Sequence, residues 1–129
     1  MLVLIALGSA LGGVARFVIG TFIEARFGAA FPVGTLLVNV SGAVLLGFIL
    51  TCALAAPGLS PEMRGLLTTG FCGGYTTFST FTFETMVLLE RGDFARAGAY
   101  VLLSVTIALA GVWFGVSLGR ALIALRQPG

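Results

Sequence analysis

The chain has 129 residues, of which 58% are hydrophobic and 9% are charged. A soluble domain usually carries about 25% charged residues, so this composition favours a protein that buries its apolar surface in a lipid bilayer. Histidine is absent, which excludes a Ser-His-Asp triad, a Cys-His pair and a histidine-ligated zinc site. The net charge of +2 is too small for nucleic-acid binding. We therefore expect a membrane protein that is not an enzyme.

Four apolar stretches are each long enough to cross a bilayer as a helix, which takes about 20 residues. They cover residues 2–25, 32–55, 62–90 and 95–125. The turns between them contain Gly28, Pro57 and Gly92, and glycine and proline commonly end helices. No soluble domain or long linker fits between the stretches. Residues 1–129 are therefore predicted to form one all-α transmembrane domain of four helices.

Glycines recur every four residues in the first and the last of these helices. Gly8 and Gly12 form one pair, and Gly111, Gly115 and Gly119 form a series. Small residues at this spacing let two helix backbones approach closely inside a membrane. We expect at least one of these glycine faces to lie at a close helix crossing.

The third helix is interrupted in its middle. Gly73-Gly74 is followed by four hydroxyl residues, Thr76, Thr77, Ser79 and Thr80. Two glycines weaken a helix by about 1 kcal/mol each, and hydroxyls can bond to backbone groups freed at a break. A simple packing kink is the alternative. We predict a discontinuous helix with its break near residues 73–77, whose freed carbonyls and N–H groups face ions.

Aromatic and acidic residues follow the break. Phe78 and Phe81 are three apart and share a helix face, and aromatic ring edges are electropositive. Thr77, Thr80 and Glu84 form an adjoining stripe. Such phenylalanines serve either as packing or as a positive lining for an anion.

Two polar residues lie deep in apolar helices. Asn39 interrupts the second helix, where its amide either bonds across helices or donates to a passing anion. Arg16 lies about 21 Å along the first helix from its start. It either reaches the interface, pairs with an acid or attracts anions to a pore mouth. In the fourth helix, Tyr100 and Ser104 share a face and extend a hydroxyl-lined track.

The arginines are balanced between the two sides of the membrane. Arg64, Arg120 and Arg126 belong to one side, and Arg26, Arg91 and Arg96 belong to the other. An excess of basic residues normally sets membrane orientation. Because this chain has almost none, we hypothesise that it inserts in both orientations and pairs as an antiparallel dimer.

Three segments resemble the signature of the CrcB/Fluc fluoride channels. They are GGVARF at residues 12–17, GTLLVNVSG at residues 34–42 and GFCGGYTTFSTFTFE at residues 70–84. Their order and spacing match the family over nearly the whole chain. Two positions depart from the family pattern: Ala108 replaces a frequent serine, and Tyr75 replaces an aliphatic residue or phenylalanine.

This resemblance implies a dual-topology antiparallel homodimer in the inner or plasma membrane, with fluoride as the transported ion. The fluoride pathway would consist of Asn39, Phe78, Phe81, Thr80, Tyr100 and Ser104. A structural Na⁺ at the dimer interface would be held by the backbone carbonyls of Gly73 and Thr76. Arg16 and Glu84 match charged positions of the family, with anion attraction or ion pairing as their expected roles.

The function expected from the resemblance is passive, fluoride-selective export that protects the cell from fluoride toxicity. Hydroxyls, an amide and aromatic edges can replace the water around fluoride without trapping it at a fixed charge. A small dual-topology proton-coupled exporter is the main alternative, and it would need a membrane-embedded carboxylate, for which Glu84 is the candidate. A structural or assembly protein is a third reading.

Overall fold

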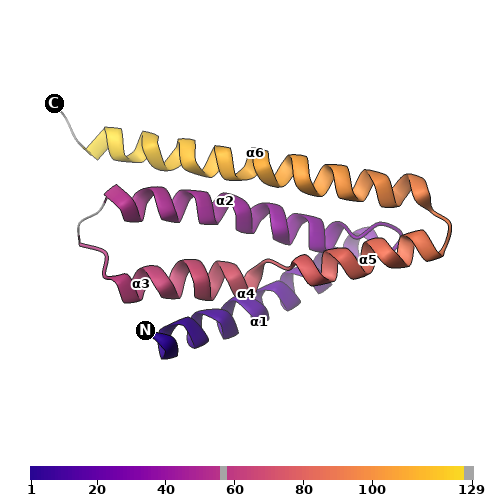
Figure 1. Ribbon diagram of the computed structural model, residues 1–129, viewed down its shortest axis with the longest axis horizontal. Coiled ribbons are helices and arrows are strands. Elements are labelled where there is room, and N and C mark those ends of the chain that lie inside the picture. Colours follow the sequence, from indigo (N-terminus) through magenta and orange to yellow (C-terminus); the bar gives the residue numbers. More distant parts are fainter. Residues whose placement is uncertain (56–57, 127–129) are drawn as a thin grey trace.

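The computed structural model describes residues 1–55 and 58–126, and all of its regular structure in these residues is helical (Figure 1). Four long segments run back and forth along the molecule. They are α1 (Leu2–Phe27), α2 (Val33–Ala55), a composite segment of α3 (Pro61–Gly65), η1 (Leu66–Cys72), α4 (Gly73–Tyr75) and α5 (Phe78–Glu90), and α6 (Phe94–Arg126). The predicted all-α fold is confirmed. Pro57, expected in the second turn, lies outside the described residues.

Three of the helices, α1, α2 and α6, are long and apolar enough to cross a membrane. The fourth crossing is the composite segment, in which a π-helix with its wider turn precedes the break. Large apolar side chains point outward along the helices; Leu2 is 81% exposed, and Phe17 and Trp113 are each 72% exposed. Because the bilayer is the solvent for such a surface, the protein is a multi-pass membrane protein.

The break falls at Thr76 and Thr77, slightly later than the glycine pair that predicted it. Gly73 and Gly74 are helical, whereas Thr76 (φ −79°, ψ 158°) and Thr77 (φ −149°, ψ 115°) are extended. Gly74 instead permits a close approach, because a Cβ at this position would lie 2.8 Å from the Cα of Ser9. The glycine pair thus provides space for α1, and the threonines carry the change of direction.

Both glycine faces lie at close helix crossings, as predicted. Added Cβ atoms on Gly8 and Gly12 would collide with the backbone of η1 and α4. An added Cβ on Gly115 would collide with the backbone of α2 at Val44. Accordingly, α2 and α6 lie side by side along most of their length (Figure 1).

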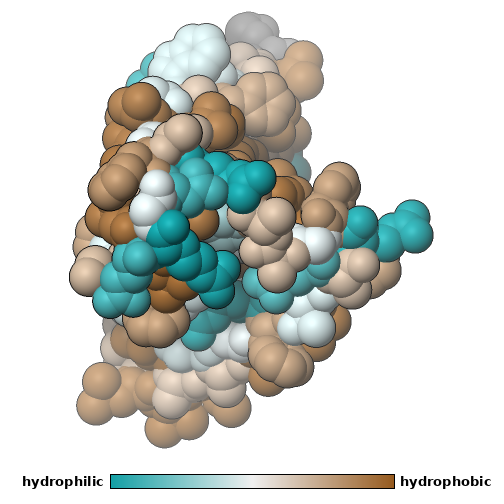
Figure 2. Space-filling model, turned by 90° about the vertical axis from the view of Figure 1, so that its right-hand side faces the viewer, coloured by the Kyte–Doolittle hydropathy of each residue, from teal (hydrophilic) through white to brown (hydrophobic). Residues whose placement is uncertain are grey.

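The two ends of the bundle carry the turns and the charges. The N-terminus and the end of α6 lie at one end, and the α1–α2 connection and the α5–α6 turn lie at the other (Figure 1). Viewed onto this second end, hydrophilic residues form a band across the middle that reaches the right edge, with hydrophobic side chains above and below it (Figure 2). An ion pair between Arg96 and Asp93 (3.0 Å) braces the α5–α6 turn. This distribution matches a bundle that spans a bilayer with its polar ends in water.

Candidate functional site: two hollows beside the helix break

The helix break is held by a side chain from α2. The Asn39 amide donates through Nδ2 to the Thr77 carbonyl oxygen (3.0 Å), and the Thr77 N–H donates to Asn39 Oδ1 (2.7 Å). Thr77 is only 7% exposed, and its backbone groups would be costly to bury without partners. The bond across helices, one of the two alternatives for Asn39, is therefore present. One further N–H of its amide remains for another acceptor.

Backbone carbonyls at the break lose the donors that a continuous helix would provide. In an uninterrupted helix, the Thr77 N–H would bond to the Gly73 carbonyl, and the Thr80 N–H would bond to the Thr76 carbonyl. Here Thr77 donates to Asn39, and Thr80 donates to the Thr77 hydroxyl (3.2 Å). Gly73 and Thr76 are thus two of the residues whose carbonyl oxygens lose their helical donors at the break.

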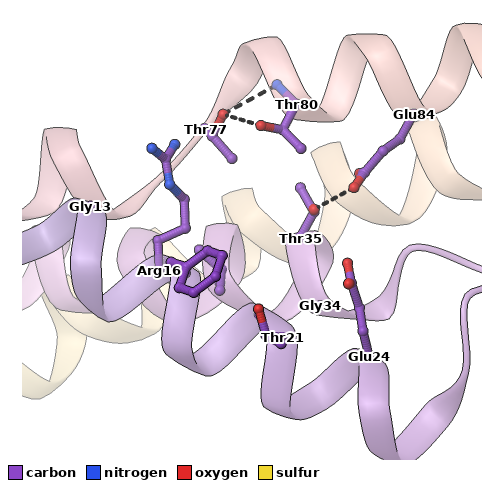
Figure 3. A pocket seen from close by; sticks show the side chains of 12 residues that line it. Gly13, Arg16, Thr21, Glu24, Gly34, Thr35, Thr77, Thr80 and Glu84 are labelled. Atoms are coloured by element: carbon purple, nitrogen blue, oxygen red, sulfur yellow. Dashed lines mark hydrogen bonds between the residues drawn. The ribbon is translucent and has the colours of Figure 1, made fainter.

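A hollow of about 380 Å³ opens on one side of the break. We call it the polar hollow, because charged and hydroxyl side chains of α1, α2 and α5 line it (Figure 3). Its lining comprises Gly13, Arg16, Phe17, Gly20, Thr21, Glu24, Gly34, Thr35, Val38, Thr77, Thr80 and Glu84. The predicted stripe of Thr77, Thr80 and Glu84 therefore faces one space.

Arg16 and Glu24 enter the polar hollow from α1. Arg16 extends toward the level of Thr77 and Thr80, and Glu24 lies beside Gly34 farther along (Figure 3). Across residues 1–55 and 58–126, the ion pair found is that of Asp93 with Arg96. Among these residues, the structure therefore places no carboxylate within 4.0 Å of the Arg16 guanidinium, which lines the hollow.

Glu84 is fixed by two hydroxyl donors. Thr35 Oγ1 donates to Glu84 Oε1 (2.8 Å), and Tyr100 Oη donates to Glu84 Oε2 (2.6 Å). Hydrogen bonds to a carboxylate are among the stronger ones in proteins. They hold the carboxylate between α2, α5 and α6, at the wall of the polar hollow.

A second hollow, also of about 380 Å³, lies on the other side of the break. We call it the apolar hollow. Its lining comprises Asn39, Thr76, Thr77, Phe78, Phe81, Ser104, Val105, Ala108, Leu109 and Val112. Thr77 lines both hollows, so both spaces border the break.

The two phenylalanines are in contact at the apolar hollow. Their ring centroids are 5.6 Å apart with planes inclined at 47°. Phe78 is 76% exposed, whereas Phe81 packs edge-on against Tyr100 at 5.1 Å. Phe81 therefore has a core role besides its place in the lining.

The sequence-predicted pathway residues are divided between these environments. Asn39, Phe78, Phe81 and Ser104 line the apolar hollow, and Thr80 lines the polar one. Tyr100 is fully buried and lines neither. The Oγ atom of Ser104 is buried and has no hydrogen-bond partner among the described residues, so it is available to bond to something that enters the apolar hollow.

Thr35 is the functional-site residue that the sequence analysis missed. Its hydroxyl orients Glu84, yet in the sequence it is a hydroxyl residue within an apolar segment and does not stand out. Its spacing of four from Asn39 gave a signal, because residues four apart share a helix face.

The chain is similar to known proteins along most of its length. A family model described as "CrcB-like protein, Camphor Resistance (CrcB)" matches residues 3–116. A protein of Rhizobium meliloti (strain 1021) named "Fluoride-specific ion channel FluC" is 43% identical over 122 residues, covering 95% of this chain and 98% of the relative.

Two further relatives carry the same name. That of Geobacter sulfurreducens is 49% identical, over 92% of this chain and 95% of the relative. That of Syntrophotalea carbinolica is 46% identical, over 94% of this chain and 98% of the relative. Since both the family model and these relatives cover nearly the whole sequence, the chain belongs to the CrcB-like family.

Proposed function

We propose that this protein is a fluoride-selective channel of the plasma membrane that lets fluoride leave the cell passively. The single observation that carries the proposal is the position of Thr77. It lines both the polar and the apolar hollow, so a polar space and a ring-lined space border one helix break. The relatives named as fluoride-specific ion channels support the choice of ion.

The lining chemistry suits a small, strongly hydrated anion. The second N–H of the Asn39 amide and the Ser104 hydroxyl, neither of which has a partner among the described residues, and the edges of Phe78 and Phe81 can each face an anion. These groups are neutral, so they replace water without holding the ion at a fixed charge. Thr80 would continue the donors into the polar hollow.

Arg16 and Glu84 would act at the polar hollow. The Arg16 guanidinium, which has no ion-pair partner among the described residues, would raise the local anion concentration. Glu84, held by Thr35 and Tyr100, would shape the wall. Tyr100 would thus serve the pathway through Glu84 and Phe81.

We further propose that two copies pair in antiparallel orientation. Gly73 at the start of α4 is exposed, and an added Cβ there would make an ordinary contact, 3.9 Å from the Thr68 carbonyl oxygen, which leaves the break accessible to a second copy. The even division of arginines between the two ends gives no strong preference for one orientation.

A structural Na⁺ at this proposed interface would bind the carbonyl oxygens of Gly73 and Thr76. Their fit follows from the hydrogen bonding, since both carbonyls lose their helical donors at the break. Carbonyl oxygens are suitable ligands for a hard cation, and a partner copy would supply an equal set. The ion would fix the two breaks to each other.

The test is fluoride efflux from proteoliposomes driven by a K⁺/valinomycin potential and read with a fluoride electrode. We expect rapid efflux of fluoride and none of chloride. Tagged C-termini should be found on both sides of the membrane. Absence of fluoride efflux from a folded, reconstituted protein would overturn the proposed function.

A proton-coupled exporter is not favoured. Its candidate carboxylate, Glu84, is engaged by two hydroxyl donors. Replacing it by Gln should leave any conducted fluoride current independent of a proton gradient, whereas an exporter would lose pH-driven transport.

A further inference from the structure

Tyr75 is the last residue of α4. Its side chain packs against α2 instead of facing lipid. Tyr75 is 6% exposed, and its hydroxyl lies 2.9 Å from Ser41 Oγ. Ser41 donates its own hydroxyl hydrogen to the Val38 carbonyl oxygen (3.1 Å). Because a hydroxyl has one hydrogen to donate, Tyr75 must be the donor to Ser41. The bonds thus run in one direction, from Tyr75 through Ser41 to the α2 backbone.

This pair lies directly across the break from the Asn39–Thr77 contact. Asn39 and Ser41 are two residues apart on α2, and they hold Thr77 and Tyr75, the residues on either side of Thr76. Thr76 itself bonds backward to the Cys72 carbonyl through its N–H and its hydroxyl, each at 3.0 Å. One helix therefore fixes both edges of the break.

The two segments are in contact as well as bonded. A Cβ added at Gly42 would lie 3.0 Å from the Tyr75 ring and would collide with the Thr76 side chain. On its other side, the Tyr75 ring stacks on Phe71 with centroids 5.9 Å apart and planes inclined at 9°. The ring alone would satisfy this packing, so the hydroxyl and its bond to Ser41 need a separate explanation.

We propose that the Tyr75–Ser41 bond is a positioning contact that holds the upstream edge of the break in the arrangement needed for ion flow. It acts through Thr76, which lines the apolar hollow. A buried hydroxyl without a hydrogen-bond partner is costly inside a membrane protein. If the bond is broken, both side chains therefore move to form hydrogen bonds elsewhere. The break then has one anchor, Asn39, instead of two.

The inference rests on the proposed channel function, so its test has one readout that depends on conduction and one that does not. The variants are Tyr75→Phe, Ser41→Ala and the double variant. Thr106→Ala is the matched control, because that hydroxyl is exposed and bonds within α6 to the Leu102 carbonyl. In proteoliposomes each single variant should lower fluoride efflux about threefold to tenfold, and the double variant should lose no more.

The second readout is amide hydrogen exchange of the purified protein. Tyr75→Phe and Ser41→Ala should each speed exchange in residues 72–78, while exchange in α6 stays unchanged. Additive efflux losses, or unchanged exchange at the break, would overturn the positioning role. Wild-type protein that passes no fluoride would overturn the proposed function instead, and the exchange result would still decide whether the pair fixes the break.

Discussion

Asn39 and Thr77 are joined by two hydrogen bonds, one in each direction, so a single side chain from α2 satisfies both backbone groups of the residue at the break. This contact replaces a turn of helix. It also diverts the Thr77 N–H from the Gly73 carbonyl and keeps a further amide N–H at the apolar hollow.

Asn39→Ala should therefore affect both folding and conduction. Leaving the buried Thr77 N–H and carbonyl without partners should lower the free energy of unfolding by about 2 kcal/mol or more. Because the amide N–H at the apolar hollow is lost as well, fluoride efflux should fall at least about tenfold, which corresponds to about 1.4 kcal/mol of barrier height. Asn39→Asp keeps the acceptor for the Thr77 N–H but loses the amide donors and sets a carboxylate oxygen against the Thr77 carbonyl, so it should lose both stability and efflux. Normal efflux in both variants would contradict the role of Asn39.

Variants of Phe78 and Phe81 should distinguish a packing role from a role in conduction. Phe78 is 76% exposed, so Phe78→Ala should change stability little and lower fluoride efflux. Phe81 packs on Tyr100, so Phe81→Ala should in addition cost about 2 kcal/mol or more in thermal or denaturant unfolding. Phe83→Ala is the control, since Phe83 is 70% exposed on the same helix and lines neither hollow. Equal efflux in the Phe78 and Phe83 variants would argue against a role for the Phe78 ring.

Removing a positive charge and removing a negative charge from the polar hollow should change fluoride efflux in opposite directions. Arg16→Gln should slow efflux, and Glu24→Gln should speed it, because one change removes a positive and the other a negative charge from the same lining. Both effects should shrink between about 0.01 M and 0.1 M salt, as the screening length falls from about 30 Å to about 10 Å. Glu62→Gln, in α3 and outside either lining, is the control. Salt-independent effects would indicate a structural role instead.

Thr35 should act through the orientation of Glu84. Thr35→Val removes the 2.8 Å bond at nearly constant volume, whereas Thr35→Ser keeps the hydroxyl. We expect the valine variant to lose fluoride efflux and the serine variant to retain it. If valine is tolerated as well as serine, the Tyr100 bond alone is sufficient to hold Glu84.

Alanine substitutions at two adjacent glycines of α1 test how closely this helix packs against η1 and α4. A Cβ at Gly12 would collide with the backbone of Phe71 and lie 2.8 Å from the Tyr75 nitrogen, whereas one at Gly13 would meet open space. Gly12→Ala should destabilise the protein by about 3 kcal/mol, because backbone cannot move aside cheaply. Gly13→Ala should be neutral or slightly stabilising in the same unfolding assay, since alanine favours helix. Similar stabilities would mean that the crossing is looser than the structure describes.

The sequence by itself determined the membrane class, the helical crossings and the existence of the break. Apolar runs longer than about 20 residues have no stable alternative to a membrane helix. The hydroxyl run after Gly73-Gly74 marked where a helix could end with its backbone groups satisfied locally, as the Thr77 cap on Thr80 now does. Helical spacing also placed Phe78 beside Phe81 correctly.

Only the tertiary structure decided which faces meet. Spacing put Tyr100 and Ser104 on one face of α6, but the position of α6 against α2 and α5 directs Tyr100 to Glu84 and leaves Ser104 at the apolar hollow. The pairings of Asn39 with Thr77 and of Tyr75 with Ser41 join residues more than 30 positions apart. Periodicity fixes directions around one helix axis, whereas such contacts depend on the register and crossing of two helices, which close glycine packing sets in three dimensions.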